Sequence, residues 1–277
     1  QTGPFRRVAR LPTRAGELPA VALAEEILTP GEGKIRALMT IAGNPVLSTP
    51  NGRQLDEALA SLDFMVALDL YQNETTRHAH VILPTTTPLE HDHYDILLGG
   101  FAVRNYAKYS KAVLDKPPGA KHDFEVFTEL GERLAVLLGV APRPRMDPTD
   151  VLRVGLAMGP YGGKRGSEAL TFEALRHAEH GMDLGALEPR LPERLKTPSG
   201  KIMLAPKLCL DDLARLHAAV AETQPGLLLI GRRHVRSNNS WMHNYRRLVK
   251  GPTRHELHMH PDDLAARGLT DGSDVRV

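Results

Sequence analysis

The chain has 277 residues, 42% of them apolar and 25% charged, and is long enough to form one large domain and a smaller one. Its net charge of +2, with Arg and Lys scattered among Asp and Glu, gives no reason to expect nucleic acid as a partner. Neither a membrane span of roughly 18–20 apolar residues nor a signal-peptide core is present, so we expect a cytoplasmic protein. The single Cys209 excludes an internal disulfide and an iron–sulfur cluster held by this chain alone.

The first half of the chain alternates between strand and helix patterns. Residues 35–41 (IRALMTI) predict a strand, residues 52–62 a helix capped by Asn51, residues 63–70 (DFMVALDL) a second strand and residues 81–84 (VILP) a short third one. Strand, helix and strand in that order predict a parallel sheet whose first βαβ unit is right-handed.

Two helices and a glycine-rich loop follow these strands. Asp123 is expected to cap a helix that Gly139 ends, and Asp147 followed by Pro148 is expected to start another. Residues 159–166 (GPYGGKRG) contain four glycines and predict a loop that lacks the spacing of a phosphate-binding P-loop. We expect the helices to cover the faces of the sheet.

The C-terminal part has a β-rich pattern. The expected elements are strands at 226–231, 255–260 and 273–277 and a short helix at 261–268. This change of pattern places the predicted domains at 1–206 and 207–277. The chain begins with Gln1 and ends in the strand pattern SDVRV, so we expect a truncated second domain and a segment of a longer protein.

A ligand site is expected beyond the carboxyl ends of the first two strands, where loops gather in open α/β sheets. Gly43, Asn44 and Pro45 follow the first strand, and Asp69 ends the second. Glycine lets a ligand approach the backbone, Asn44 offers an amide, and the Asp69 carboxylate suits the two adjacent N–H donors of guanine. Taken alone, however, Gly-Asn-Pro is more often an ordinary turn.

Other catalytic chemistry has weaker signals. The 13 histidines include pairs spaced to share one face of a strand, which can suit a metal, but these pairs lie in different elements and lack the HExxH spacing. The histidines concerned are His78, His80, His91, His93, His255, His258 and His260. No Gly-x-Ser-x-Gly elbow occurs, and Cys209, among leucines, is expected to be a small core residue. We therefore predict no catalytic and no metal-ligating residue.

Five segments together resemble one known family. In chain order they are AGNPVLSTPNGRQLDEAL, DFMVALDLYQNETTRHAHVILPTTTPLEHD, TPSGKIMLAP, LLLIGRRHVRSNNSWMHN and HMHPDDLAARGLTDGSDVRV. Their order and spacing are similar to the C-terminal half of the molybdopterin oxidoreductases. These bis-molybdopterin guanine dinucleotide enzymes include formate dehydrogenases, nitrate reductases and dimethyl sulfoxide reductase.

The resemblance implies a fold and a set of binding residues. It implies a doubly wound, mainly parallel α/β domain of the dinucleotide-binding type, followed by the truncated start of a β-barrel domain that closes over both pterins. The residues implied near the dinucleotide are Gly43, Asn44, Pro45, Asp69, Asn73, Glu74, Thr75 and Asp92, and those implied near the pterin are Arg232, Arg233, His234, Asn238, Asn239 and Ser240. Two positions depart from the family pattern: Asn73 replaces a common Thr, and His93 replaces the Gly that often follows the acidic residue.

The resemblance also implies cofactors and partners. The full-length protein would carry bis-molybdopterin guanine dinucleotide with molybdenum or tungsten, and an iron–sulfur cluster in its N-terminal part. Its partners would be the remaining domains of the parent chain, a small-molecule substrate and an electron-transfer partner, and the segment alone would be inactive. Two alternatives stay open, a non-catalytic nucleotide-binding or assembly module and a histidine-metal hydrolase.

Overall fold

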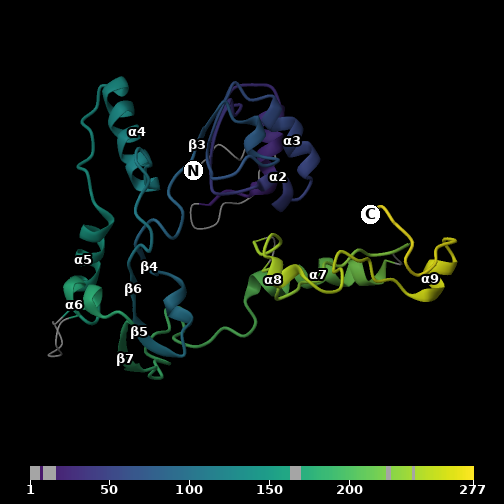
Figure 1. Ribbon diagram of the computed structural model, residues 1–277. Helices are drawn as coiled ribbons and strands as arrows, with labels where there is room; N and C mark the ends of the chain where they lie inside the picture. The colour runs from purple at the N-terminus through teal and green to yellow at the C-terminus, as the bar shows by residue number, and fades with distance from the viewer. Residues whose placement is uncertain (1–6, 9–16, 163–169, 223–225, 239–240) are drawn as a thin grey trace. The chain divides into compact units, whose positions relative to one another are not determined.

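The computed structural model describes residues 7–8, 17–162, 170–222, 226–238 and 241–277 (Figure 1). The chain divides into two compact units, Gln1–Arg190 and Leu191–Val277. The predicted domain limits, 1–206 and 207–277, place the boundary later in the chain and stay a prediction.

The N-terminal unit is built on a small parallel sheet. Its strands are β1 (Ala37–Ile41), β2 (Phe64–Leu68) and β3 (Val81–Leu83), in the order β1-β2-β3, and both pairs are parallel. The helix α3 (Gly52–Ala60) connects β1 to β2, with Asn51 at its N-cap position. The prediction of a mixed α/β fold with a parallel sheet is therefore confirmed. The order of the described strands does not reverse, so a doubly wound sheet stays a prediction.

The core of this sheet region comes from one face of α3 and from the short helix α1 (Leu23–Leu28), which follows the turn η2 (Ala20–Ala22). Apolar residues recur in α3 at helical spacing, and their side chains pack against the strand residue Met65. The buried cluster is Ala24, Ile27, Leu55, Ala58, Leu59, Leu62 and Met65.

The other described residues of the N-terminal unit form two antiparallel strand pairs and three helices. β4 (His93–Tyr94) pairs with β6 (Tyr109–Ser110), and β5 (Arg104–Ala107) pairs with β7 (Met182–Ala186). The remaining elements are the short turns η3 (Thr76–His78) and η4 (Leu98–Phe101) and the helices α4 (Asp123–Leu138), α5 (Pro148–Met158) and α6 (Phe172–His177). Ala107, Tyr109, Leu170, Phe172 and Leu175 form a second buried cluster.

The helix ends confirm two predictions and correct a third. Asp147 caps α5, accepting a hydrogen bond from the Thr149 N–H at 2.8 Å, and Gly139 ends α4 with a left-handed φ of 65°. The cap of α4, however, is His122 and not Asp123. His122 has the extended backbone of a cap and donates its N–H to Glu125 Oε2 at 2.7 Å, whereas Asp123 already lies inside the first turn.

The C-terminal unit contains α7 (Lys207–Ala221), α8 (Arg246–Val249) and α9 (Pro261–Ala265), and α9 confirms the helix predicted at 261–268. The strands expected at 226–231, 255–260 and 273–277 do not form. A strand needs a partner backbone, and no strand occurs among the described residues of this unit. Cys209 lies on α7 and is exposed, so its predicted burial is wrong. No described helix has both the length and the apolar character needed to cross a membrane.

Of the predicted loop at 159–166, residues 159–162 form a turn, and the others lie outside the described residues.

Candidate functional site

The carboxyl ends of β1 and β2 bring two predicted loops together. Ile41 lies opposite Leu68 in the parallel register, and the Ala42 N–H continues the ladder by donating to the Leu68 carbonyl at 2.8 Å. Because parallel strands end at the same edge of a sheet, the segments 43–45 and 69–75 leave it side by side.

Hydrogen bonds join these two loops. Asn44 Nδ2 donates to Glu74 Oε2 at 2.8 Å, and the Thr75 hydroxyl donates to Asn44 Oδ1 at 2.7 Å. The same hydroxyl accepts a hydrogen bond from the Val46 N–H at 3.1 Å. The Asn44 amide, the largest cause, holds the pKa of the Glu74 carboxyl below its ordinary value. Thr75 is 0% exposed, so its hydroxyl holds the loops together and does not face a ligand in this structure.

The Asp69 loop is ordered by its own polar side chains. Asp69 Oδ1 accepts the Tyr71 N–H at 3.0 Å, and Asn73 Nδ2 lies 3.4 Å from Asp69 Oδ2. Asn73 Oδ1 accepts the N–H groups of Thr75 and Thr76, both at 3.0 Å. Asp69 is half-buried, and a carboxylate offers about four acceptor sites, so part of its capacity remains for a ligand.

Gly43, next to Asn44, and Gly52, at the start of α3, play different roles. A Cβ on Gly43 would make only ordinary contacts, the nearest being 3.6 Å from the Ile41 carbonyl oxygen, so packing does not require glycine there. A Cβ on Gly52, at the start of α3, would lie 2.0 Å from the Val46 carbonyl oxygen. Gly52 is therefore needed for α2 (Pro45–Ser48), which begins directly after Asn44, to pack against α3. Gly52 was predicted only as the first residue of the helix 52–62, and its contact with Val46 was not foreseen.

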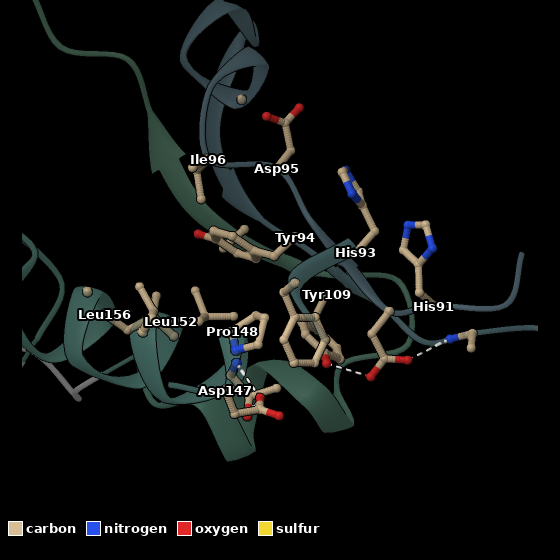
Figure 2. Close-up of a pocket in the computed structure, with 18 of the residues that line it drawn as sticks. His91, His93, Tyr94, Asp95, Ile96, Tyr109, Asp147, Pro148, Leu152 and Leu156 are labelled. Atoms are coloured by element: carbon tan, nitrogen blue, oxygen red, sulfur yellow. Dashed lines mark hydrogen bonds between the residues drawn. The ribbon is translucent and has the colours of Figure 1, made fainter. Parts of the chain in front are cut away.

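Asp92 lies in a different part of the N-terminal unit. Its Oδ2 accepts the Tyr109 hydroxyl at 2.5 Å, and its Oδ1 accepts the Ala112 N–H at 2.8 Å. Asp92 also lines a cavity of about 1360 Å³. Figure 2 shows the Tyr94 ring near Pro148 and Leu152 in this cavity, which His93 and Asp95 also line. Because both oxygens of Asp92 accept hydrogen bonds from residues in β6 or just after it, this carboxylate stabilises the β4–β6 region.

In the C-terminal unit, the predicted pterin residues surround a turn. The His234 carbonyl accepts the Ser237 hydroxyl at 2.8 Å, and His234 Nδ1 accepts the Arg236 N–H at 3.1 Å. Arg232 and Arg233 are exposed, as is Asn238, which has a left-handed φ of 42°. Asn239 and Ser240 lie outside the described residues.

Comparison with known proteins identifies the family. Residues 6–133 match the family model of molybdopterin oxidoreductases, and residues 227–277 match that of the molydopterin dinucleotide binding domain. The chain belongs to the molybdopterin oxidoreductase family. Its resemblance to that family, expected from five sequence segments, is thereby confirmed.

Several molybdopterin oxidoreductase relatives are longer than this chain. The assimilatory nitrate reductase catalytic subunit of Bacillus subtilis is 33% identical over 122 residues, which are 43% of this chain and 16% of the relative. Trimethylamine-N-oxide reductase of Haemophilus influenzae is 25% identical over 306 residues, covering 96% of this chain and 36% of the relative. The NADPH-Fe(3+) oxidoreductase subunit alpha of Geobacter sulfurreducens is 26% identical over 250 residues, covering 89% of this chain and 24% of the relative.

A solved structure has a similar fold. Acetylene hydratase from Pelobacter acetylenicus superposes with a TM-score of 0.58 at 18% identity, covering 91% of this chain and 35% of the hydratase chain. This chain thus spans about a third or less of the length of that structure and of the relatives above.

The residues at the edge of the sheet fit the dinucleotide cofactor of the molybdopterin oxidoreductases. Gly43 leaves its backbone open, and the Asp69 carboxylate has acceptor capacity in reserve. A polar ligand along this edge would supply partners to these groups. Among the described residues, no group of three or more His, Cys, Asp or Glu side chains is arranged to hold a metal ion.

One prediction arises at the cavity. Burial, and then the hydrogen bond to Asp92, raises the pKa of Tyr109 well above its ordinary value of 10.0. In the unfolded chain the Tyr109 hydroxyl loses its proton near pH 10. The contribution of Tyr109 to the free energy of unfolding is therefore complete below pH 10 and is lost as the pH rises through the higher pKa of the folded chain. We expect Tyr109→Phe, which keeps the ring contact with Phe172, to delete a tyrosinate absorbance step above pH 10 in a spectrophotometric titration. An unchanged titration would contradict this assignment.

Proposed function

We propose that this chain forms part of the binding surface for bis-molybdopterin guanine dinucleotide in a molybdenum or tungsten oxidoreductase. The observation that carries the proposal is the paired edge of the sheet. There, Asn44 and Thr75 hold the two loops side by side, and Asp69 keeps acceptor capacity for a base. When bound, the cofactor supplies the redox-active metal, and this chain binds and orients it.

The residues have separate roles in this proposal. Gly43 and Pro45 give the dinucleotide a close path along the backbone, while Asn44, Asn73, Glu74 and Thr75 fix the loops around Asp69. Asp69 contacts the guanine edge. Asp92 supports the neighbouring β4–β6 region through its bond to Tyr109.

The C-terminal unit is proposed to contact the pterin. Its match to the dinucleotide-binding domain model supports this role. The donors come from arginine, histidine, amide and hydroxyl groups, which suit phosphate and the pterin edge. The proposed residues are Arg232, Arg233, His234, Asn238, Asn239 and Ser240. We further propose that the stretch 227–277 forms the start of a β-barrel when neighbouring strands pair with it.

The longer relatives support a larger functional assembly. We propose that the full protein is cytoplasmic and adds an iron–sulfur cluster, further strands that make the sheet doubly wound, a small-molecule substrate site and an electron-transfer partner. The relative from Geobacter sulfurreducens is named as a subunit, which agrees with a multi-chain assembly. This segment alone is expected to be inactive.

The proposal is tested by the nucleotide preference of the chain. Guanine presents two adjacent N–H donors to a carboxylate, whereas adenine presents a ring acceptor beside its amine. We expect GDP to bind more tightly than ADP, and Asp69→Asn to weaken GDP binding by about 10- to 100-fold while improving ADP relative to GDP. Asparagine can still accept the Tyr71 N–H, so this variant changes recognition without removing the turn. Isothermal titration calorimetry measures both affinities.

The matched control is Asp63→Asn. Asp63 precedes β2 at the opposite end from Asp69 and pairs with Arg36, so its change should leave both affinities unaltered. Equal binding of GDP and ADP by the wild type would contradict the guanine proposal. So would GDP binding that is indifferent to the Asp69 change. Nucleotide binding by a full-length protein that contains neither molybdenum nor tungsten would favour the non-catalytic module instead.

A further inference from the structure

Tyr71 presents an exposed aromatic ring from a fixed position in the Asp69 loop. The residue is 74% exposed, yet hydrogen bonds hold its peptide groups on both sides. Its N–H donates to Asp69 Oδ1 at 3.0 Å, and its carbonyl accepts the hydroxyl of Thr76 at 3.0 Å. Thr76 is 0% exposed, so the second bond anchors Tyr71 to the interior of the unit. The backbone that carries the ring is therefore fixed while the ring remains in solvent.

The surroundings of Tyr71 suit a flat ligand with a polar edge. Ile41, at the end of β1, and Leu70, next to Tyr71, are also exposed large apolar residues at the carboxyl ends of the paired strands. Single exposed apolar residues are common on protein surfaces and need no explanation. Here, however, one turn holds both an aromatic residue and a carboxylate with free acceptor capacity, because the backbone N–H of Tyr71 donates to the Asp69 carboxylate.

We propose that Tyr71 is the stacking surface for the base of the dinucleotide, and that Asp69 contacts the edge of the same base. The inference rests on the proposed function and adds a binding residue that lies outside the set expected from the sequence. The two residues would divide recognition. An aromatic ring stacks on any base because every base has a π face, whereas a carboxylate distinguishes one base edge from another.

Replacing Tyr71 should therefore change the nucleotide affinities in a different way from replacing Asp69. We expect Tyr71→Ala to lower the affinities for GDP and ADP by the same factor, about 10-fold, because stacking does not depend on the base edge. Tyr71→Phe keeps the ring and should bind both nucleotides within about twofold of the wild type. Asp69→Asn, in contrast, should change the ratio of the two affinities. Calorimetric titration of the purified chain with GDP and ADP provides these values.

A spectroscopic readout tests the contact directly. A stacked base shifts the proton resonances of the ring it covers, so titration of the chain with GMP should move the Tyr71 ring signals. These signals are assigned by their absence from the spectrum of Tyr71→Phe. The matched control is Phe101→Ala, because Phe101 is 83% exposed and ends η4, away from the Asp69 loop in sequence. This control should leave both nucleotide affinities and the Tyr71 shifts unchanged.

The outcomes separate this inference from the proposed function. If Asp69→Asn alters the GDP-to-ADP ratio but Tyr71→Ala leaves both affinities unchanged, the stacking inference is overturned and the guanine site stands. If the wild type binds GDP and ADP equally and Tyr71→Ala weakens both, stacking is supported and guanine recognition fails. Absence of binding for both nucleotides would overturn both. Similar melting temperatures for wild type and Tyr71→Ala would confirm that the exposed ring acts on binding and not on folding.

Discussion

Replacing Thr75 by valine is expected to lower the free energy of unfolding of the N-terminal unit by about 2–4 kcal/mol. Valine has nearly the shape of threonine, so the change removes the hydroxyl and little else. The hydroxyl donates to Asn44 Oδ1 and accepts the Val46 N–H, and the side chain is fully buried. In the valine variant, Asn44 Oδ1 and the Val46 N–H would each lose a hydrogen bond at a position that water reaches poorly. The change should also weaken GDP binding, since the loop that carries Asp69 loses two of its hydrogen bonds to the segment that follows β1 and keeps the one between Asn44 and Glu74.

Thr75→Ser is the matched control, because serine keeps the hydroxyl and loses only a methyl group. We expect it to retain most of the stability and the GDP affinity of the wild type. Urea unfolding followed by circular dichroism measures the stability of the two variants. Equal stability of Thr75→Val and Thr75→Ser would show that the hydrogen bonds between the loops contribute little.

Removing the buried carboxylate of Glu26 is expected to have an effect of similar or greater size. The Glu26 side chain is 0% exposed; its Oε1 accepts the Val8 N–H at 2.8 Å, and its Oε2 lies 3.3 Å from Arg7 Nε. Glu26→Ala leaves the Arg7 guanidinium, itself only 20% exposed, without its counter-charge. Breaking a buried ion pair in this way typically costs about 3–5 kcal/mol, and we expect a loss in this range.

A double replacement separates the charge effect from the loss of packing. In Arg7→Met with Glu26→Met, neither charge is left alone and much of the buried volume is kept. We therefore expect the double variant to be more stable than Glu26→Ala, as urea unfolding of both proteins would show. A double variant as unstable as Glu26→Ala would mean that the hydrogen bond from Val8, and not the ion pair, dominates.

Local signals in the sequence predicted part of the fold. The helix pattern of α3 and the apolar runs of β1 and β2 predicted elements that the structure contains, because burial on one face leaves a periodic trace in the sequence. The cap of α5 was equally local, since Asp147 and Pro148 are adjacent. The strands expected at 226–231 and 273–277 failed because a strand depends on a distant partner, which residue patterns alone do not reveal.

The candidate site was predictable in position but not in detail. The parallel order of the strands placed Asn44 and Asp69 at one edge, which the register of β1 and β2 bears out. Polar loop residues were expected to face a ligand, yet Asn44 and Thr75 face each other. Hydrogen bonds between residues about 30 positions apart leave no periodic signal. Tyr71 was missed for a related reason, because an exposed loop residue has no pattern; its place two residues after Asp69, which directly follows β2, was the available clue.

The pairing of β5 with β7 has a consequence for how the family can change. Ala107 lies opposite Met182, so the chain leaves and re-enters this small sheet at neighbouring points. Between these points β6 still pairs with β4, but the described residues of the stretch 123–177, which carries α4, α5 and α6, form no strand pairing. This stretch is therefore a cassette whose length can vary without displacing β1, β2 or β3. Each doubling of such a closed loop costs only about 0.6 kcal/mol of chain entropy. Insertions in this cassette can therefore add new surfaces while the sheet edge that carries Asp69 stays unchanged.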